Sequence, residues 1–343
     1  HFLRLGVAMN AGRLCFVGLI GLAWSACGLA ESYKVPRLAD GTPDFQGVWT
    51  NATATPLERP SEFDNRRALT KEEAAAIEAR ERGRVAADAA PSDPNKKIEA
   101  VAALPPVGNY NLFWTDRGMT AALINGEYRT SIIIDPPNGR IPPLTEEARK
   151  RPRLSRGVAD GPESRSLGER CLLSFGSSAG PPMLPTMYNS YYQIVQSPGH
   201  VMILVEMVHD ARIIRIDGKP VPSSIKKWMG DSIGHWEGDT LVVRTSNLRP
   251  EQALRGGTAE NMVVTERFTR VADDQILYRF TVEDPTTFTA PFTGELPFMR
   301  VDAQVYEYAC HEGNYALPGI LAAEREAEKR AAQEAAKKAE KKK

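Results

Sequence analysis

The sequence has none of the short motifs by which nucleotide-dependent and zinc-dependent enzymes are usually recognised. Neither the P-loop pattern nor the Gly-x-Gly-x-x-Gly fingerprint occurs in its 343 residues. His-Glu-x-x-His, His-x-His and Cys-x-x-Cys, which are common spacings of zinc ligands, are absent as well. We therefore expect a protein that works without a nucleotide, a metal ion or another cofactor.

An excess of charge of either sign is also missing. The chain carries 43 basic and 43 acidic residues, so its formal net charge is zero. Residues 321–343 are basic overall, which leaves the rest of the body mildly acidic. Such a body has no basic surface with which to hold phosphate groups, and we expect no nucleic-acid partner.

The apolar run near the start of the chain is too short to cross a membrane. It covers residues 14–24, LCFVGLIGLAW, whereas a spanning helix needs about 20 apolar residues. A basic residue precedes the run and small residues follow it, as in a cleavable signal segment over residues 1–30. The pattern predicts a periplasmic or secreted protein. Cys27 leaves a lipid-anchored form open as a less favoured alternative.

Cysteine is scarce. Two of the four cysteines lie in or beside the signal segment, and the body keeps Cys171 and Cys310. In an exported protein two body cysteines most simply form one disulfide, and we predict that these two are joined. Two buried free thiols are the alternative.

Short apolar segments separated by turn residues fill most of the body. In residues 275–282 apolar and polar side chains alternate, which is typical of a strand with one buried face. These segments predict a mainly β protein, an antiparallel meander that closes into a lipocalin-like barrel or packs as a sandwich. A barrel is preferred because closure leaves no exposed strand edge. The expected strands are 45–50, 128–134, 191–196, 201–216, 231–236, 240–245, 263–271, 275–282 and 306–310.

Helices are expected in two places only. Thr70 and Glu73 form a capping-box pattern at the start of a surface helix near residues 70–90. Residues 321–343 are almost entirely Ala, Glu, Lys and Arg, which predicts a charged, solvated helix or a frayed tail. The expected organisation is a signal segment, one β-rich domain over residues 31–320, and this tail. The basic tail offers a peripheral contact with a membrane or the cell wall.

One expected strand carries an unusual density of ionisable side chains. Glu206, His209, Asp210 and Arg212 interrupt an otherwise apolar segment. Because side chains alternate along a strand, Glu206, Asp210 and Arg212 should share one face and His209 the other. The structural interpretation is a buried carboxylate–arginine network with a packed histidine. The functional interpretation is an acid–base site, with His209 as the acid or base and Arg212 holding a substrate carboxylate.

A second group of polar residues surrounds the last cysteine. His311 and Glu312 follow Cys310 directly and would form a further acid–base pair at the mouth of a cavity. The structural interpretation is a solvated histidine beside a structural disulfide. No spacing of ligands supports a metal site of two histidines and a carboxylate, and no metal site is predicted.

Several other residues are candidates for substrate contacts. Aromatic rings and amides in loops suit an apolar or aromatic ligand, and a buried arginine suits its carboxylate. Packing in the core is the alternative for each aromatic side chain. The candidates are Arg129, Tyr188, Asn189, Trp228 and Phe288.

The chain resembles a widespread family of uncharacterised exported proteins of environmental proteobacteria and acidobacteria. Stretches that carry the resemblance are TPDFQGVW, RTSIIIDPPNGRIPPL, DGPESRSLGERC, EMVHDARII, GDSIGHWEGDTLVV and EYACHEGNY, spread over most of residues 42–315. The resemblance implies a link to the breakdown of plant-derived aromatic compounds by non-hydrolytic steps such as lyase or decarboxylase reactions.

The sequence thus favours a small-molecule enzyme. The expected activity is that of a lyase, decarboxylase or isomerase acting by acid–base chemistry on an apolar or aromatic carboxylic compound in a barrel cavity. A periplasmic protein that binds an apolar ligand without reaction is the first alternative, and a structural protein of the cell envelope is the second.

Overall fold

The fold is taken from a computed structural model. It describes residues 33–89, 91, 115–116, 118–151, 159–174, 180–252, 254 and 258–340. The chain divides into two compact units, residues 1–34 and 35–343, and the second unit contains all the strands and helices given below. The predicted signal segment and Cys27 lie outside the described residues.

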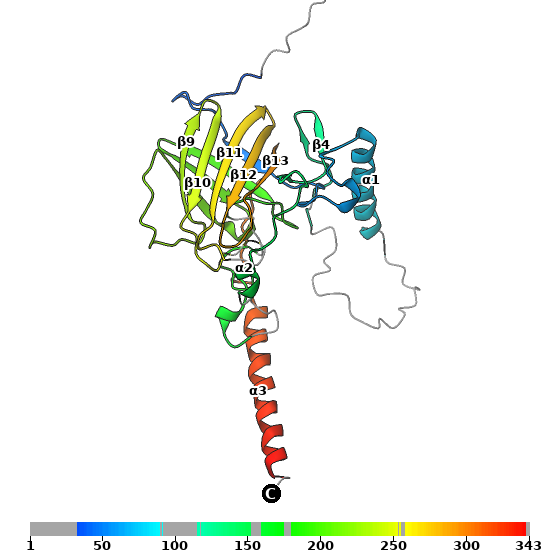
Figure 1. Cartoon of the computed structure of the whole chain (residues 1–343), viewed down its shortest axis with the longest axis vertical. Helices are drawn as coiled ribbons and strands as arrows, with labels where there is room; N and C mark the ends of the chain where they lie inside the picture. Colours follow the sequence, from blue (N-terminus) through cyan, green and yellow to red (C-terminus); the bar gives the residue numbers. More distant parts are fainter. Residues whose placement is uncertain are drawn as a thin grey trace, which may run out of the picture. The chain divides into compact units, whose positions relative to one another are not determined.

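Nine strands form a closed barrel of mixed direction, which confirms the predicted barrel. Each strand pairs with the next in the order given below, and β1 returns to β13, with Val48 opposite Val301. Several of these strands lie side by side in Figure 1. They are β1 (Gly47–Thr50), β6 (Tyr191–Ser197), β7 (His200–Val205), β8 (Ala211–Ile216), β9 (Asp231–Glu237), β10 (Thr240–Ser246), β11 (Val263–Ala272), β12 (Gln275–Glu283) and β13 (Phe292–Val301).

The antiparallel meander is confirmed except for one pair. β8 and β9 run parallel, with Ile214 opposite Ser232 and Ile216 opposite Gly234. A hairpin turn can join antiparallel neighbours only, whereas parallel neighbours need a crossover connection. The loop 217–230 supplies that crossover between β8 and β9.

The predicted strand over residues 201–216 is wrong, because a tight turn divides it. β7 ends at Val205, a short 3-10 turn (η4) covers Met207–His209, and β8 begins at Ala211. Val208 and His209 have φ of 63° and 61°, a left-handed conformation that side chains rarely adopt. The alternation rule therefore does not relate Glu206 to the residues of β8.

The end of the barrel also differs from the prediction. Residues 306–310 form no strand, and the last strand is β13, which the sequence did not indicate. β13 contains Pro297, opposite Leu277 of β12, and proline argues against a central strand because it has no N–H to donate. The predicted disulfide is present: Cys171 and Cys310 are bonded, with their Cα atoms 5.7 Å apart.

A smaller helix–sheet unit is formed by residues from before and after α1. Its sheet has the order β2 (Ala68–Leu69), β4 (Glu127–Arg129) and β3 (Leu123–Ile124). The predicted surface helix is α1 (Lys71–Asp88), and its capping box is formed as expected. The predicted strand 128–134 is divided between β4 and β5 (Ile133–Asp135), and β5 joins the edge of β13 instead.

The remaining helices are short or have no buried side chain apart from Ala148 of α2. Between β5 and β6 lie α2 (Glu146–Lys150) and a 3-10 turn, η3 (Pro162–Ser164). Another 3-10 turn, η1 (Ser61–Phe63), precedes β2. The charged tail is helical as predicted but begins earlier: α3 spans Ala316–Glu340, and none of its side chains is buried. Among the described residues, no helix has the length and apolarity needed to cross a membrane.

Aromatic side chains fill the interior of the barrel. Tyr278 on β12 is fully buried and packs against the rings of Phe268 and Phe298, at centroid distances of 5.0 and 5.1 Å. Its hydroxyl accepts a hydrogen bond of 2.9 Å from the backbone N–H of Met183, which is also fully buried. This part of the interior is therefore a packed core.

A buried ion pair lies in the same core. Arg212 and Glu266 are 2% and 0% exposed, and one guanidinium N–H donates to Glu266 Oε1 at 3.0 Å. The Tyr278 hydroxyl donates to the same oxygen at 2.8 Å, while Ser232 and Thr245 accept from Arg212. Removing two charges from water is costly, so the pair depends on these surrounding hydrogen bonds.

Replacing Arg212 by Met should therefore destabilise the protein strongly. The substitution leaves the Glu266 carboxylate buried without its cation, at an expected cost of about 3–5 kcal/mol in the free energy of unfolding. The double variant Arg212→Met/Glu266→Gln should recover at least half of this loss. Urea denaturation measures both effects.

Arg267→Met is the matched control. Arg267 pairs with Glu237 at 2.7 Å on the surface, where both side chains are more than 40% exposed. Its loss should change the free energy of unfolding by less than about 1 kcal/mol. Equal, small losses in both arginine variants would contradict the role given to the buried pair.

Candidate functional site

The turn between β7 and β8 brings several predicted site residues to one end of the barrel. Its backbone is closed by a hydrogen bond of 2.8 Å from Val205 N–H to the Asp210 carbonyl and one of 3.1 Å from His209 N–H to the Glu206 carbonyl. Glu206 is buried, Asp210 is half-buried and His209 is exposed. The turn thus gives three ionisable side chains three different environments.

The Glu206 carboxylate ties two other segments to this turn. One oxygen accepts a hydrogen bond of 2.6 Å from the side-chain amide of Asn189, and the other accepts one of 3.2 Å from the backbone N–H of Tyr306. Asn189 itself has a left-handed φ of 55°, which asparagine tolerates well. The predicted residues Glu206 and Asn189 are therefore in direct contact.

Two polar residues near Glu206, Tyr191 and Asp116, were not predicted as site residues from the sequence. Burial, followed by the nearby carboxylates of Asp116 and Glu206, raises the pKa of the Tyr191 hydroxyl. The backbone N–H of Asp116 donates to the Met187 carbonyl at 2.8 Å, which holds this loop beside the start of β6. No sequence motif marks Asp116, because its position depends on a contact between distant parts of the chain.

Asp210 has the most altered carboxyl group of the turn. Burial raises its pKa to about 6, and the neighbouring His209 opposes this shift. Among the described residues, its buried Oδ2 atom has no hydrogen-bond partner. A carboxyl group in this state exchanges its proton close to neutral pH, as general acid–base catalysis requires.

The two arginines predicted to hold a substrate carboxylate are already paired. Arg212 lies in the barrel core with Glu266, and it does not share a surface with Glu206 as the strand prediction required. Arg129 is 1% exposed and donates from Nε to Glu295 at 2.8 Å. The carboxylates of the fold thus occupy both guanidinium groups.

The aromatic candidates belong to the main core or pack against it. Phe288 is 3% exposed and packs edge-on against Phe292 at a centroid distance of 5.2 Å. The ring of Trp228 is covered by the guanidinium of Arg249, 4.3 Å from its centroid. Tyr188 packs partly buried against the main core, in the loop that also carries Asn189. Their substrate contacts stay predictions.

His311 and Glu312 follow the disulfide and are both exposed. The next contacts along the chain come from Asn314, whose side-chain amide donates to the Glu169 carbonyl at 2.8 Å and lies 3.4 Å from Cys171 Sγ. The described residues include no cluster of three or more His, Cys, Asp or Glu side chains that could hold a metal ion. The role of His311 and Glu312 as an acid–base pair stays a prediction.

The described residues form a closed, mixed β-barrel with a disulfide, and the turn between β7 and β8 holds the buried Glu206 and the half-buried Asp210. The chain matches no protein-family model, and a search of the curated proteins found no similar sequence. The resemblance to a family of exported proteins therefore stays a prediction.

The raised pKa of Asp210 predicts a specific dependence of stability on pH. Because the folded-state pKa is above the unfolded value, Asp210 stabilises the fold fully below about pH 4, and this contribution is lost as the pH rises through about 6. The difference in Tm between the wild type and Asp210→Asn should thus shift in favour of the variant between pH 4 and pH 7.

Thermal unfolding at half-unit pH steps measures this difference. Glu260→Gln is the control, since Glu260 is an exposed carboxylate of the surface. Its Tm difference from the wild type should stay flat over the same range. A flat curve for Asp210→Asn as well would contradict the assignment of a raised pKa.

Proposed function

We propose that the protein is an exported, cofactor-independent enzyme that moves a proton on a small apolar or aromatic compound at the turn between β7 and β8. The observation that carries the proposal is Asp210, a half-buried carboxyl group with a pKa near 6 at the end of the barrel. Perturbed ionisable groups held in this way are characteristic of acid–base sites. Lyase and isomerase reactions that add or remove a proton can use such a group.

The contacts at the turn suggest a division of roles. Asp210 would give or take the proton, and the exposed His209 beside it would exchange that proton with water. Glu206 would act as a positioning residue, since its two oxygens hold Asn189 and the backbone of Tyr306 in place. His311 and Glu312 would be a second acid–base pair, in the segment that follows Tyr306.

The acidic side chains near the turn bear on the charge of the substrate. Glu206 and Asp210 at the turn and Asp116 near Tyr191 are all acidic, and like charges repel a carboxylate. The two arginines expected to bind that carboxylate are occupied by Glu266 and Glu295. We therefore propose an uncharged apolar or aromatic substrate in preference to the carboxylic compound that the sequence suggested.

Binding without reaction is the second candidate function. It is supported by the ring of Tyr306, which is 67% exposed although its backbone N–H is bonded to the buried Glu206. An exposed aromatic ring next to a polar cluster can stack on an apolar ligand. In this case the carboxyl groups would only hold the loops in position.

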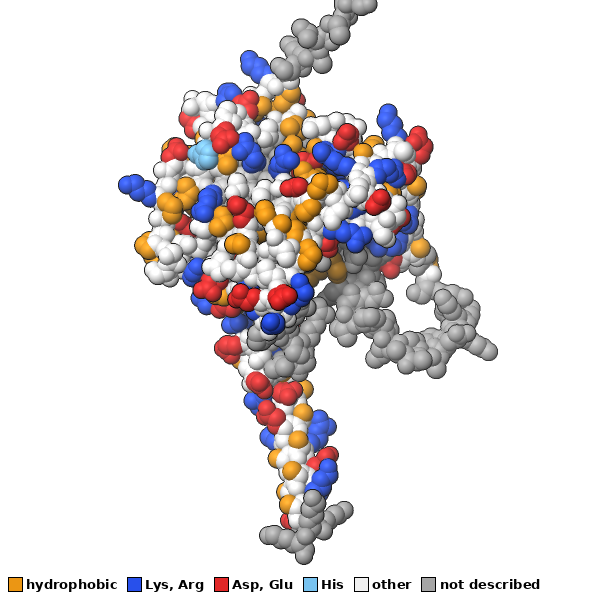
Figure 2. Space-filling model, viewed as in Figure 1, with side chains coloured by type: hydrophobic (Ala, Val, Ile, Leu, Met, Phe, Trp, Pro, Cys, Tyr) orange, Lys and Arg blue, Asp and Glu red, His pale blue; other side chains and the backbone are white. Residues whose placement is uncertain are grey.

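The compartment and the surface charge complete the proposal. The disulfide between Cys171 and Cys310 is compatible with an oxidising compartment outside the cytosol. Export to the periplasm or the medium rests on the sequence pattern of residues 1–30. Acidic and basic side chains are interspersed on the face of the barrel seen in Figure 2, which suits a small-molecule function better than nucleic-acid binding.

Turnover of a defined substrate panel tests the proposal. The purified full chain is incubated with a mixture of monocyclic aromatic alcohols, aldehydes and alkenes and the matching carboxylic acids, and products are identified by NMR spectroscopy and mass spectrometry. We expect at least one uncharged compound to react, and Asp210→Asn to lower kcat by about 100-fold or more, in the range of a lost general acid or base.

The control for this experiment is Glu260→Gln, which should keep the wild-type rate. The wild-type kcat should also change with pH around a midpoint near 6, and this dependence should be lost in Asp210→Asn. Binding of a compound without any product would favour the second candidate. A reaction that proceeds equally well in Asp210→Asn would contradict the proposed mechanism.

A further inference from the structure

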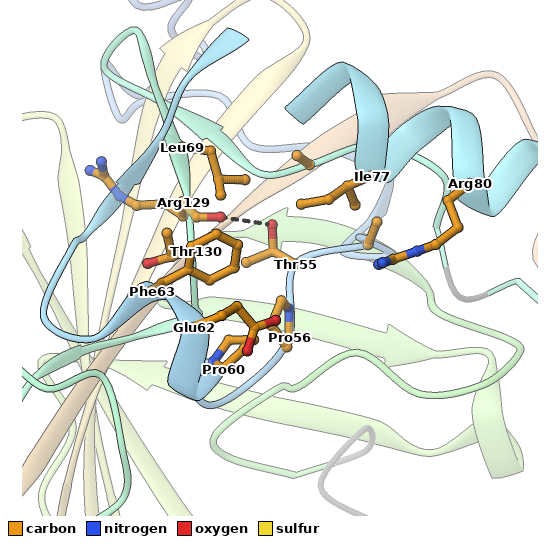
Figure 3. Close-up of a pocket in the computed structure, with 12 residues that line it drawn as sticks. Thr55, Pro56, Pro60, Glu62, Phe63, Leu69, Ile77, Arg80, Arg129 and Thr130 are labelled. Carbon is orange, nitrogen blue, oxygen red and sulfur yellow. Dashed lines mark hydrogen bonds between the residues drawn. The ribbon is translucent and has the colours of Figure 1, made fainter. Parts of the chain in front are cut away.

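The helix–sheet unit contains a pocket that is separate from the turn between β7 and β8. Its volume is about 220 Å³, and it opens between α1, the three-stranded sheet and the segment that leads from β1 to β2. Figure 3 shows its lining residues. The apolar part of the lining consists of Ala54, Pro56, Pro60, Phe63, Leu69, Ile77 and Ala121.

The pocket exists because the core of this unit contains few large side chains. The buried members of that core are Leu69, Ala74 and Ala121, and the larger Phe63 and Ile77 are only partly buried against them. The two alanines that line the pocket, Ala54 and Ala121, leave space that larger side chains would fill. A volume of this size holds one ring with a small substituent, since a cavity of about 150 Å³ already binds benzene.

The polar groups in the wall are already bonded within the protein. The hydroxyl of Thr55 accepts a hydrogen bond of 2.8 Å from Ala122 N–H, and that of Thr130 accepts one of 2.9 Å from Arg59 Nε. The Thr130 hydroxyl also lies 2.8 Å from the Arg66 carbonyl. Because these wall groups are satisfied, the body of a bound molecule should be apolar.

The opening of the pocket carries charge. Arg80 of α1 lies on one side and Glu62 on another, with Pro56 between them in the view of Figure 3, where the Arg80 side chain extends toward the pocket. Arg80 is 74% exposed, and its described ion pair, with Glu81, is long at 3.8 Å. A guanidinium in this state can bind a carboxylate at the pocket entrance.

We propose that this pocket binds a small apolar carboxylate, with the ring or branched chain against Phe63 and Ile77 and the carboxylate on Arg80. The proposal does not rest on the function assigned to Asp210, because no residue is shared between the two places. The site would hold a monocyclic aromatic acid such as benzoate, as a ligand bound without reaction.

Binding is tested on the full chain with benzoate, benzyl alcohol and benzylamine as probes. Chemical shifts of the Ile77 methyl group report occupancy by NMR titration. Nine non-hydrogen atoms in a partly open pocket should give benzoate a Kd on the order of 1 mM. Benzyl alcohol should bind several-fold more weakly, and benzylamine should bind most weakly of the three.

Variants separate the two parts of the site. Arg80→Gln should weaken benzoate about fivefold to tenfold and leave benzyl alcohol unchanged, while Arg84→Gln, one turn further along α1, should alter neither. Ala54→Leu should block all three probes by filling the pocket, and Ala86→Leu, on an exposed position of α1, should not. Asp210→Asn should bind benzoate as the wild type does.

Three results of these titrations would contradict the proposed binding site. Failure of all three probes to shift the Ile77 methyl in the folded wild type would overturn it. If benzylamine bound as tightly as benzoate, the role of Arg80 would be overturned and the charge contact would lie on Glu62. Loss of benzoate binding in Asp210→Asn would show that the ligand occupies the turn between β7 and β8 instead.

Discussion

The ion pair between Arg212 and Glu266 constrains the use that the barrel can make of its interior. Both groups are buried, and together with Tyr278, Ser232 and Thr245 they form a closed set of hydrogen bonds. Breaking such a set to admit a ligand would leave a charge without a partner in a medium of low polarity. The interior around Tyr278 therefore serves as packed core that holds the strands together, and it is not a ligand site.

The acid–base site is therefore proposed at the end of the barrel and not in its interior. There the chain reverses through Val208 and His209, whose left-handed backbone places Glu206 and Asp210 in different surroundings although they are only four residues apart. Glu206 is tied by Asn189 and Tyr306, whereas Asp210 keeps one oxygen buried without a partner among the described residues. This difference makes Asp210 the group best suited to exchange a proton.

Much of the fold follows from local patterns in the sequence. The hairpins β9–β10 and β11–β12, the cap of α1 and the disulfide were all predicted, because each depends on residues near one another or on a pairing with no competitor. β13 was missed because Pro297 opposes a central strand locally, and long-range pairing with β12 overrides that preference.

The candidate site was predicted only in part. Glu206, His209 and Asp210 stood out as charges in an apolar segment, but their faces were assigned wrongly because a turn with two left-handed residues leaves no clear signal. The contacts with Asp116 and Tyr306 depend on segments far apart in the chain, which no local pattern specifies. Arg212 lies in the core because it pairs with Glu266 on a different strand, a contact that no local pattern reveals.

The state of the Asp210 carboxyl group is the central claim, and it can be measured directly. The side-chain carboxyl carbons of aspartate are followed by NMR spectroscopy from pH 3 to pH 9, and the Asp210 signal is assigned by its absence in Asp210→Asn. A midpoint near 6 is the result that this account predicts. A midpoint near 4, the ordinary value for aspartate, would contradict it and leave the turn between β7 and β8 as a structural feature.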